Sequence, residues 1–193
     1  MLPDAPKSEP PYPPLSASRL RNAEHPLYEA AKQLYESSFP REERRSDPQH
    51  RRALADEAFH SLALSDERGL AAILYYWQHP DFTFIEHLAV CPERRGCGIG
   101  HRVLRMAAEE LSPDRPVILE IEPAIDDRTR RRLRFYESCG YQRLPDYHEQ
   151  QPYHAGLEPL PMELLLLPQG GACRRPDAFE DYLLTRVMQY RDR

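Results

Sequence analysis

Lysine is scarce in this 193-residue chain, and long apolar runs and a surplus of positive charge are missing from it. The 26 basic residues include only two lysines, Lys7 and Lys32, and 31 acidic residues leave a net charge of −5. An acidic balance argues against a general nucleic-acid binder. No segment holds the ~18 consecutive apolar residues of a membrane span, and the N-terminus lacks the pattern of a signal peptide. We therefore expect a cytoplasmic protein without nucleic-acid or membrane partners.

Paired cysteines and metal-ligand clusters are missing too. The four cysteines show neither CxxC spacing nor a His-rich metal pattern. This usage fits reduced cysteines in the cytoplasm, and we expect no metal ion. Cys97 stands among glycines before a helix, where a reactive thiol is one interpretation. A tolerated loop residue is the favoured one, because the sequence places no base beside it.

The most informative segment is an apolar strand that leads into a glycine-rich loop and then a helix. The strand ends at Leu88-Ala89-Val90, and the loop reads Arg95-Gly96-Cys97-Gly98-Ile99-Gly100. Glycines let the backbone approach a ligand and leave N–H groups free to bind an anion. The N-terminus of the following helix adds positive charge. The segment therefore predicts a phosphate or pyrophosphate site.

Two general nucleotide motifs do not fit this loop. Walker A requires Lys-Ser or Lys-Thr after the last glycine, and neither follows here. The Rossmann pattern G-x-G-x-x-G requires a sixth-position glycine, where this chain has His101 or Val103, depending on the starting glycine. A nucleotide-binding regulator stays open as a rival and would bind ATP or NAD more tightly than coenzyme A.

A third pattern fits better. The loop matches the [QR]-x-x-G-x-[GA] motif of the GNAT superfamily of acyl-CoA-dependent N-acetyltransferases. Downstream, the segment 133–141 (LRFYESCGY) resembles the family's second CoA-side element, a helix that carries a Tyr and closes with Gly-aromatic. The resemblance covers roughly residues 15–168. It implies an α/β (α+β) GNAT fold, in which a mixed, mostly antiparallel sheet is flanked by helices on both faces and splayed where CoA inserts.

The resemblance also implies an activity, namely direct acetyl transfer from acetyl-CoA to an amine of unknown identity. Main-chain atoms of Leu88 and Val90 would pair with the pantetheine arm, and the Val90 N–H would polarise the thioester. Tyr136 would protonate the leaving thiolate, with packing under its helix as the alternative. Many relatives carry Asn where this chain has Thr129, which can still donate a hydrogen bond to CoA. The predicted cofactor-binding residues are Leu88, Val90, Arg95, Gly96, Cys97, Gly98, Ile99, Gly100, His101 and Thr129.

Glu86 is the candidate base. Strand alternation puts Phe84, Glu86, Leu88 and Val90 on one face and His87 on the other. A carboxylate within an apolar strand either meets a partner or lies at a cleft. Glu86 is therefore either the group that activates the amine or half of a structural ion pair with an arginine.

Further charged and polar residues bear on how CoA and the acceptor amine would bind. Glu120 and Glu122 share a strand face and would favour a cationic amine, unless nearby arginines neutralise them. The arginines of the segment 128–134 either meet the 3′-phosphate of CoA or form a solvated helix face. The polar and aromatic segment 147–153 resembles an acceptor-side lid of bacterial GNAT proteins of unassigned substrate, and an ordinary surface crossover is the alternative.

The chain organisation predicts one domain with two appendages. Six of the 20 prolines lie in residues 1–14, which indicates a disordered tail. The acetyltransferase domain would occupy 15–168, and residues 169–193 would form a linker and a helix packed on it. We expect a monomer or homodimer. A catalytically inactive acyl-CoA-binding sensor is the alternative to an enzyme. The predicted elements are helices from 25, 48–58, 99–111, 127–139 and 177–190, and strands 59–66, 69–78, 82–90, 117–122, from 141, and 161–167.

Overall fold

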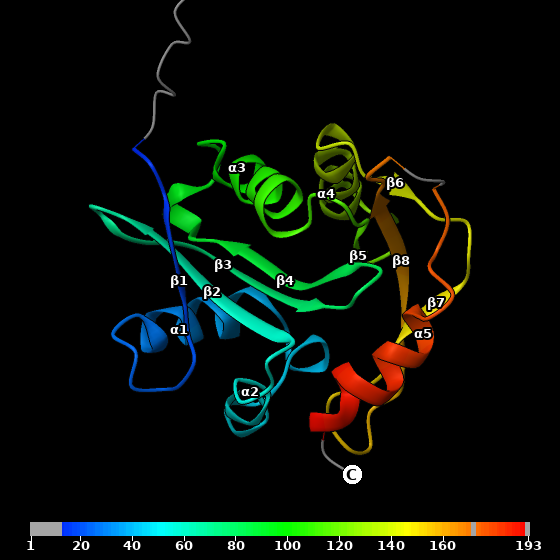
Figure 1. Cartoon of the computed structure of the whole chain (residues 1–193), viewed down its shortest axis with the longest axis horizontal. Helices are drawn as coiled ribbons and strands as arrows, with labels where there is room; N and C mark the ends of the chain where they lie inside the picture. Colours follow the sequence, from blue (N-terminus) through cyan, green and yellow to red (C-terminus); the bar gives the residue numbers. More distant parts are fainter. Residues whose placement is uncertain (1–12, 171–172, 192–193) are drawn as a thin grey trace, which may run out of the picture.

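The computed structural model describes residues 13–170 and 173–191. A twisted sheet runs through the molecule with helices on both of its faces (Figure 1). Most of the tail predicted over 1–14 lies outside the described residues. Its last two residues, Pro13 and Pro14, belong to no helix or strand, and the Pro13 carbonyl accepts a hydrogen bond from Arg102 Nη2 at 2.9 Å.

The sheet is mixed and mostly antiparallel, as the family resemblance predicts. Its order is β1-β2-β3-β4-β5-β8-β6, with β7 paired to β8, and of the described strands only β4 and β5 run parallel. The strands are β1 (Ser16–Arg19), β2 (Phe59–Asp66), β3 (Gly69–Gln78), β4 (Thr83–Val90), β5 (Val117–Ile121), β6 (Gln142–Arg143), β7 (His148–Gln150) and β8 (Leu160–Leu167). The fold class expected from the sequence is therefore confirmed.

Helices lie on both faces of the sheet. They are α1 (Tyr28–Ser38), α2 (Asp47–Ala53), α3 (Ile99–Met106), α4 (Asp127–Ser138) and α5 (Phe179–Tyr182). Ser46 and Asp126 begin α2 and α4 with capping boxes, in which each side chain accepts the N3 backbone N–H. Short π-helical turns over 107–111 and 183–187 extend α3 and α5.

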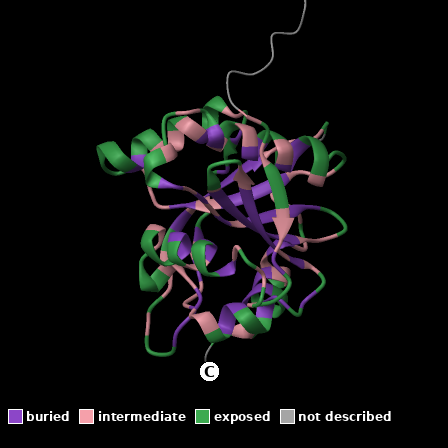
Figure 2. Ribbon diagram, turned by 90° about the vertical axis from the view of Figure 1, so that its left-hand side faces the viewer, coloured by how far each residue is buried: buried purple, intermediate pink, exposed green. Residues whose placement is uncertain are grey.

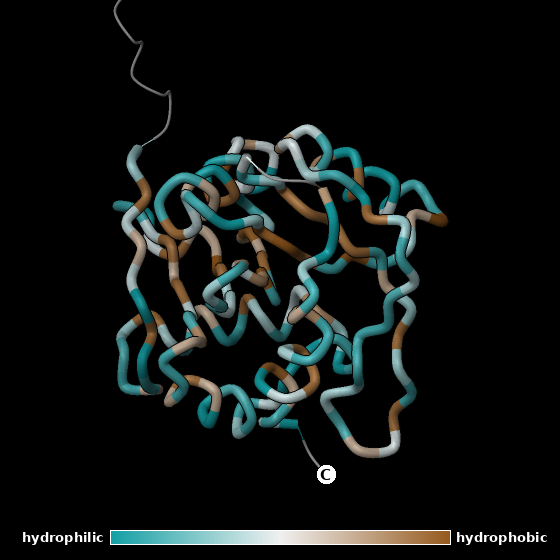
Figure 3. Tube along the Cα trace, turned by 45° about the vertical axis from the view of Figure 1, so that its right-hand side comes forward, coloured by the Kyte–Doolittle hydropathy of each residue, from teal (hydrophilic) through white to brown (hydrophobic). Residues whose placement is uncertain are grey.

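Two apolar clusters fill the space between the sheet and its helices. The α1–α2 face buries Trp77, Phe84 and Phe179, and α5 packs here as well. The α3–α4 face buries Ile85 and Leu119. The sheet is the most buried part of the molecule (Figure 2), and apolar segments concentrate along its strands (Figure 3). Burial of this apolar surface is the main force that holds helices to both faces.

A β-bulge interrupts β4 at Glu86. Ile85 and His87 oppose the consecutive β3 residues Tyr76 and Tyr75, so Glu86 is the extra residue. The strict alternation predicted for this strand is wrong, because the bulge turns the Glu86 and His87 side chains to the same α1–α2 face. There His87 packs edge-on against Phe39, with ring centroids 4.6 Å apart.

The same region is where two central strands separate. The bridges between β4 and β5 extend only as far as Ile85 and Leu119. Beyond this pair the facing edge of β4 has no strand partner among the described residues. The Cys91 N–H donates to the Ala71 carbonyl of β3, so strand alternation directs the Val90 N–H to the opposite, open edge. This separation is the opening for a ligand that the resemblance predicts.

Most central strand boundaries agree with the sequence within one residue, but two short strands and some helix ends differ. β1 and β7 were not expected, since each has too few residues for a clear pattern. The segment 48–58 is helical only to Ala53, and the C-terminal segment is divided among α5, a π-helical turn and a final 3₁₀ turn. Phe179 of α5 is fully buried against Phe82 and Phe84.

Glycines fix the geometry between β4 and α3. Gly98, the N-cap of α3, has φ of +71° in the left-handed region. A Cβ on Gly100 would lie 2.9 Å from Phe135 Cζ, so this glycine allows α3 and α4 to approach closely. These constraints place the loop amides at the wide end of the gap between β4 and β5.

We predict that Gly98→Ala lowers the free energy of unfolding by about 1–2 kcal/mol, because a side chain with Cβ is strained at this φ. Gly98→Asn should cost less, because Asn tolerates the left-handed region. Urea denaturation of the three proteins measures the difference. Equal stability of Gly98→Ala and the parent protein would contradict this account of the loop.

Candidate active site

A cleft of about 820 Å³ opens where β4 and β5 separate. One end is formed by the glycine loop and α4, and the other by residues after α1 together with β7 and β8. Of the predicted site residues, those that line it are Glu86, Leu88, Val90, Arg95, Gly96, Gly98, Ile99, Gly100, His101 and Tyr136. The structure thus brings most of the predicted site together. Cys97 and Thr129 do not line the cleft.

The loop end is suited to an anion. Gly98 caps α3, an eight-residue helix whose first turn opens onto the cleft. The Arg95 Nε donates to the Val90 carbonyl at 3.2 Å, which holds this exposed side chain beside the end of β4. His101 Nε2 lies 3.1 Å from Ser138 Oγ, which links α3 to α4. Arg94, which precedes Arg95, is not simply solvated, because it forms an ion pair with Asp66.

Thr129 has a different task from the one predicted. It is buried at the start of α4, where its backbone N–H and hydroxyl bond to Asp126 Oδ1 at 2.7 and 2.8 Å. Its hydroxyl also accepts the Asp126 N–H at 3.0 Å. The side chain is therefore engaged in the helix cap. The Asn that many relatives carry at this position gave no indication of the capping role.

Tyr136 lies on α4 and lines the cleft, as predicted. Burial raises the pKa of Tyr136 to about 12, so the phenol keeps its proton at neutral pH. Gly140 and Tyr141 follow, and the Tyr141 N–H donates to the Tyr136 carbonyl at 3.2 Å, which closes the helix. Within the described residues no protein group is bonded to the Tyr136 hydroxyl, and it is available to a ligand.

Glu86 is enclosed by three donors. Arg45 Nη2 and Tyr153 Oη each donate to Oε1 at 2.8 Å, and Trp77 Nε1 donates to Oε2 at 2.8 Å. Only 1% of the side chain is exposed. Burial alone would raise the pKa of Glu86, but Arg45 and these hydrogen bonds outweigh it and lower the pKa. The structural ion pair that the sequence left open is thus present at Glu86.

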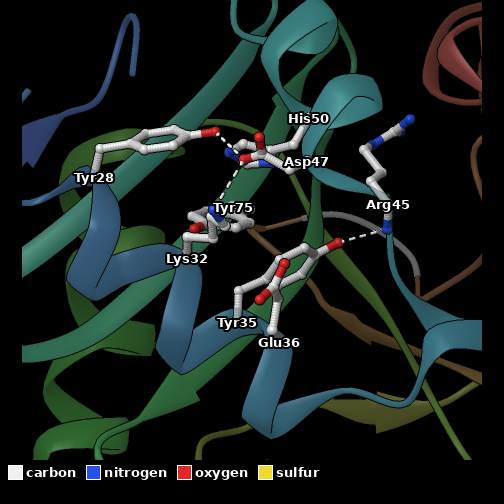
Figure 4. A pocket seen from close by; sticks show the side chains of 8 residues that line it. All are labelled: Tyr28, Lys32, Tyr35, Glu36, Arg45, Asp47, His50 and Tyr75. Carbon is white, nitrogen blue, oxygen red and sulfur yellow. Dashed lines mark hydrogen bonds and ion pairs between the residues drawn. The ribbon is translucent and has the colours of Figure 1, made fainter. Parts of the chain in front are cut away.

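Arg45 is fixed from both ends. Tyr35 Oη accepts the Arg45 backbone N–H at 2.9 Å, and Figure 4 shows the guanidinium extended away from this bond. Arg45 Nη2 also donates to the Val187 carbonyl at 2.6 Å. The cavity drawn in Figure 4 has a volume of about 10 Å³, space for one water molecule. It is therefore too small for an acceptor substrate.

Glu120 contrasts with Glu86. It is the first β5 residue after the last bridge to β4, it lines the cleft, and 12% of its side chain is exposed. Its Oε1 lies 2.7 Å from His148 Nε2. Among the described residues, Oε2 has no protein donor. Nearby arginines therefore do not neutralise Glu120, whereas Glu122 is bound by both Arg128 and Arg132, at 2.9 and 2.5 Å.

Glu43 is a further cleft carboxylate, and it has no ion-pair partner among the described residues. It lies just before Arg44, in a 3₁₀ turn over 41–43. Burial and the negative charge of Glu122 raise the pKa of Glu43 above its ordinary value, against the opposing effect of Arg132. Glu43 therefore adds a carboxylate, unpaired within the described residues, to the end of the cleft that lies away from the glycine loop.

Comparison with known proteins agrees with this geometry. The acetyltransferase (GNAT) family model matches residues 25–141. This chain belongs to the GNAT family. Its membership supports acyl-CoA-dependent acetyl transfer, an enzymatic activity, and gives no support to a binding-only sensor.

Individual relatives extend the comparison. The chain is 33% identical over 115 residues to YjbC of Bacillus subtilis (strain 168), provisionally named as an acetyltransferase; the match covers 54% of this chain and 57% of YjbC. A solved GNAT-family structure from Bacteroides thetaiotaomicron is 28% identical, with a TM-score of 0.77 over 90% of this chain and 98% of that one. A GNAT acetyltransferase from Elizabethkingia anophelis, solved with acetyl-CoA, is 14% identical, with a TM-score of 0.52 over 79% and 97% of the two chains.

Arg45 could not be identified as a site residue from the sequence, whereas the segment 147–153 carried a signal. Arg45 stands in a charged turn with four other ionisable residues, and nothing distinguishes it as buried. The segment 147–153 is not a surface crossover, because His148, Gln150 and Tyr153 are buried and Gln150 lines the cleft. The unusual density of His and Tyr in this segment was the available signal.

Within residues 13–170 and 173–191, no group of three or more His, Cys, Asp or Glu side chains is placed to hold a metal ion. No helix in that section of the chain has the length and apolar character to cross a membrane.

We predict that Arg45→Met lowers the free energy of unfolding by about 3–5 kcal/mol, because it leaves Glu86 charged and buried without a cation. The double variant Arg45→Met with Glu86→Gln should recover much of this loss, since no unpaired charge remains. Guanidinium denaturation measures both. The pKa of Glu86 is lowered in the folded protein, so its stabilisation is lost as pH falls through that pKa. Equal stability of Arg45→Met and the parent would contradict the proposed pairing.

Proposed function

We propose that this protein is an acetyl-CoA-dependent N-acetyltransferase that acts on a cationic amine by direct attack. The observation that carries the proposal is the separation of β4 from β5. It joins the glycine loop, the open edge of β4, Tyr136 and Glu120 in one cleft. Enclosing both reactants in one site makes the transfer effectively unimolecular.

Acetyl-CoA would occupy the α3–α4 side of the cleft. The loop from Arg95 to His101 would hold the pyrophosphate, and the open edges of Leu88 and Val90 would pair with the pantetheine arm. Of the arginines considered for the 3′-phosphate, only Arg128, Arg131 and Arg132 line the cleft. Arg131 is the exposed one that has no ion-pair partner among the described residues, so we assign the phosphate contact to it. The acetyl-CoA complex of the Elizabethkingia protein is consistent with this fold's use of that ligand.

Glu120 replaces Glu86 as our candidate base. A base needs a free lone pair and access to the amine. Glu86 lacks this access, since three donors hold its two oxygens and only 1% of its side chain is exposed. Glu120 has both, because Oε2 has no donor among the described residues and the residue lines the cleft. Glu86 instead fixes the bulge from which the open edge of β4 begins.

The proposed reaction begins with deprotonation of the ammonium group and ends with release of CoA. Glu120 takes a proton from the ammonium group, and the free amine attacks the thioester carbonyl, whose oxygen accepts the Val90 N–H. The C–S bond then breaks, and Tyr136 donates its phenolic proton to the thiolate. The raised pKa of Tyr136 keeps that proton in place until negative charge develops on sulfur. The new amide nitrogen still carries one proton in excess, which passes to the Tyr136 phenolate, and Glu120 releases its proton to solvent.

The acceptor is proposed to carry more than one positive charge. Glu43 and Glu120 line the acceptor end without an arginine partner among the described residues, while Arg128 and Arg132 are both bound by Glu122. A second ammonium group on the substrate would therefore be attracted. We further propose a cytoplasmic enzyme, monomeric or homodimeric, with neither nucleic acid nor membrane as partner, in keeping with the net charge of −5.

We predict that Glu120→Gln lowers kcat by about 10²–10⁴-fold, the usual contribution of a general base. The KM for acetyl-CoA should change little, because Glu120 lies at the acceptor end. The assay follows release of free CoA thiol with a panel of amines. In the parent protein a diamine should show a higher kcat/KM than the monoamine of equal chain length.

The control is Glu86→Gln, assayed at a temperature where circular dichroism shows that it is folded. It should retain acetyl transfer with an unchanged dependence on pH. A folded Glu86→Gln without activity, beside a fully active Glu120→Gln, would reverse the assignment of the base. Equal kcat/KM for the monoamine and the diamine would refute the cationic acceptor.

A further inference from the structure

His148 lies buried between two carboxylates. Its side chain is 1% exposed. Nε2 is 2.7 Å from Glu120 Oε1, and Nδ1 is 3.2 Å from Glu180 Oε1. Both ring nitrogens thus face an acceptor. A neutral imidazole carries only one N–H. The lone pair of its other nitrogen would then face a lone pair of a carboxylate oxygen, which is repulsive. The geometry therefore favours the doubly protonated imidazolium.

The charges around His148 agree with this state. Burial lowers the pKa of His148, but the hydrogen bonds and negative charges of Glu120 and Glu180 outweigh it, so that the pKa lies above its ordinary value. Arg175 is the next charge outward, with Nη1 2.5 Å from Glu180 Oε1. On the other side, the ring lies 6.1 Å from that of Phe179, which carries no charge. The chain Glu120–His148–Glu180–Arg175 alternates in sign from the cleft outward.

Three separate segments build this chain, and two lie outside the 25–141 region that matches the family. Glu120 is on β5, His148 on β7, and Glu180 on α5. β7 is held by pairing of His148 with Met162 of β8. The segment after α5 is held by Arg186, whose Nη2 donates to Asp56 Oδ1 at 2.6 Å. The C-terminal segment is thus anchored independently of the His148 contact.

We propose that His148 is a positioning residue for Glu120, and that Glu180 of the C-terminal segment holds it in its cationic form. The proposal rests on Glu120 as the base of the proposed function. The imidazolium binds Oε1 of Glu120 and so directs Oε2 to the cleft. By this route a helix that does not line the cleft acts on the reaction.

Steady-state kinetics of His148→Gln and Glu180→Gln test the proposal. Gln can bond to Glu120 but carries no positive charge, and Glu180→Gln removes only a half-exposed charge that lies outside the cleft. Both variants should lower kcat by about 10- to 100-fold, the scale of a misplaced catalytic group. The KM for acetyl-CoA should stay within twofold.

Glu149→Gln is the matched control. Glu149 lies next to His148 on β7, and its carboxylate bonds to the exposed Tyr147 rather than to this chain of charges. Its kinetics and pH profile should equal those of the parent protein. If His148→Gln and Glu180→Gln, both folded, keep the parent kcat and pH profile, the positioning role is refuted.

A measurement without turnover separates this inference from the proposed function. The imidazole ¹⁵N signals of His148, identified by their loss in His148→Gln, report its protonation by NMR. They should show the imidazolium at neutral pH, and Glu180→Gln and Glu120→Gln should each shift its titration to lower pH. A neutral His148 in the parent protein at pH 7 would refute the inference even if acetyl transfer is observed. If the imidazolium is present but Glu120→Gln retains full activity, Glu120 is not the base, and the positioning role fails with it.

Discussion

The buried pairing of Arg45 with Glu86 is the constraint on which the site depends. Glu86 is the extra residue of the β4 bulge, and Arg45, Trp77 and Tyr153 hold its carboxylate on the α1–α2 face. The last bridge between β4 and β5 joins Ile85, the residue just before Glu86, to Leu119. The network therefore anchors β4 at the point where the cleft begins, and Tyr153 ties the segment after β7 to the same carboxylate. A charge buried this deeply tolerates only a geometry in which all its partners are present.

The surroundings of two neighbouring carboxylates, Glu86 and Glu120, give them different roles. Glu86 and Glu120 are the first residues of β4 and β5 beyond their last bridge. Three hydrogen-bond donors hold the carboxylate of Glu86, whose pKa is lowered. Glu120 has one oxygen bound to His148 and the other without a donor among the described residues. Tyr136, on the opposite side of the cleft, keeps its proton because burial raises its pKa to about 12. An acid–base pair requires one group that keeps its proton until it is needed and another that can accept a proton.

The local patterns predicted the fold and the anion end of the site. The strand segments of β2, β3 and β4, the glycine loop and the Tyr136 block are contiguous signals, and each is confirmed as an element or as cleft lining. The bulge was not predictable, because it shifts the pairing by one residue without any unusual residue type. Arg45 and His148 could not be identified as buried ion-pair residues either. Their partners lie 41 and 28 residues away in sequence, and burial of such charges is decided by tertiary contacts alone.

The measurement that tests the central claim most directly is calorimetric titration of the full-length protein with acetyl-CoA, beside CoA, ATP and NAD. If the separated strands and the glycine loop form an acyl-CoA site, acetyl-CoA should bind with a Kd in the micromolar range, with a stoichiometry of one per chain. ATP and NAD should bind far more weakly, because they lack the pantetheine arm that pairs with the open edge of β4. Tighter binding of ATP or NAD, or no binding of acetyl-CoA, would contradict the account.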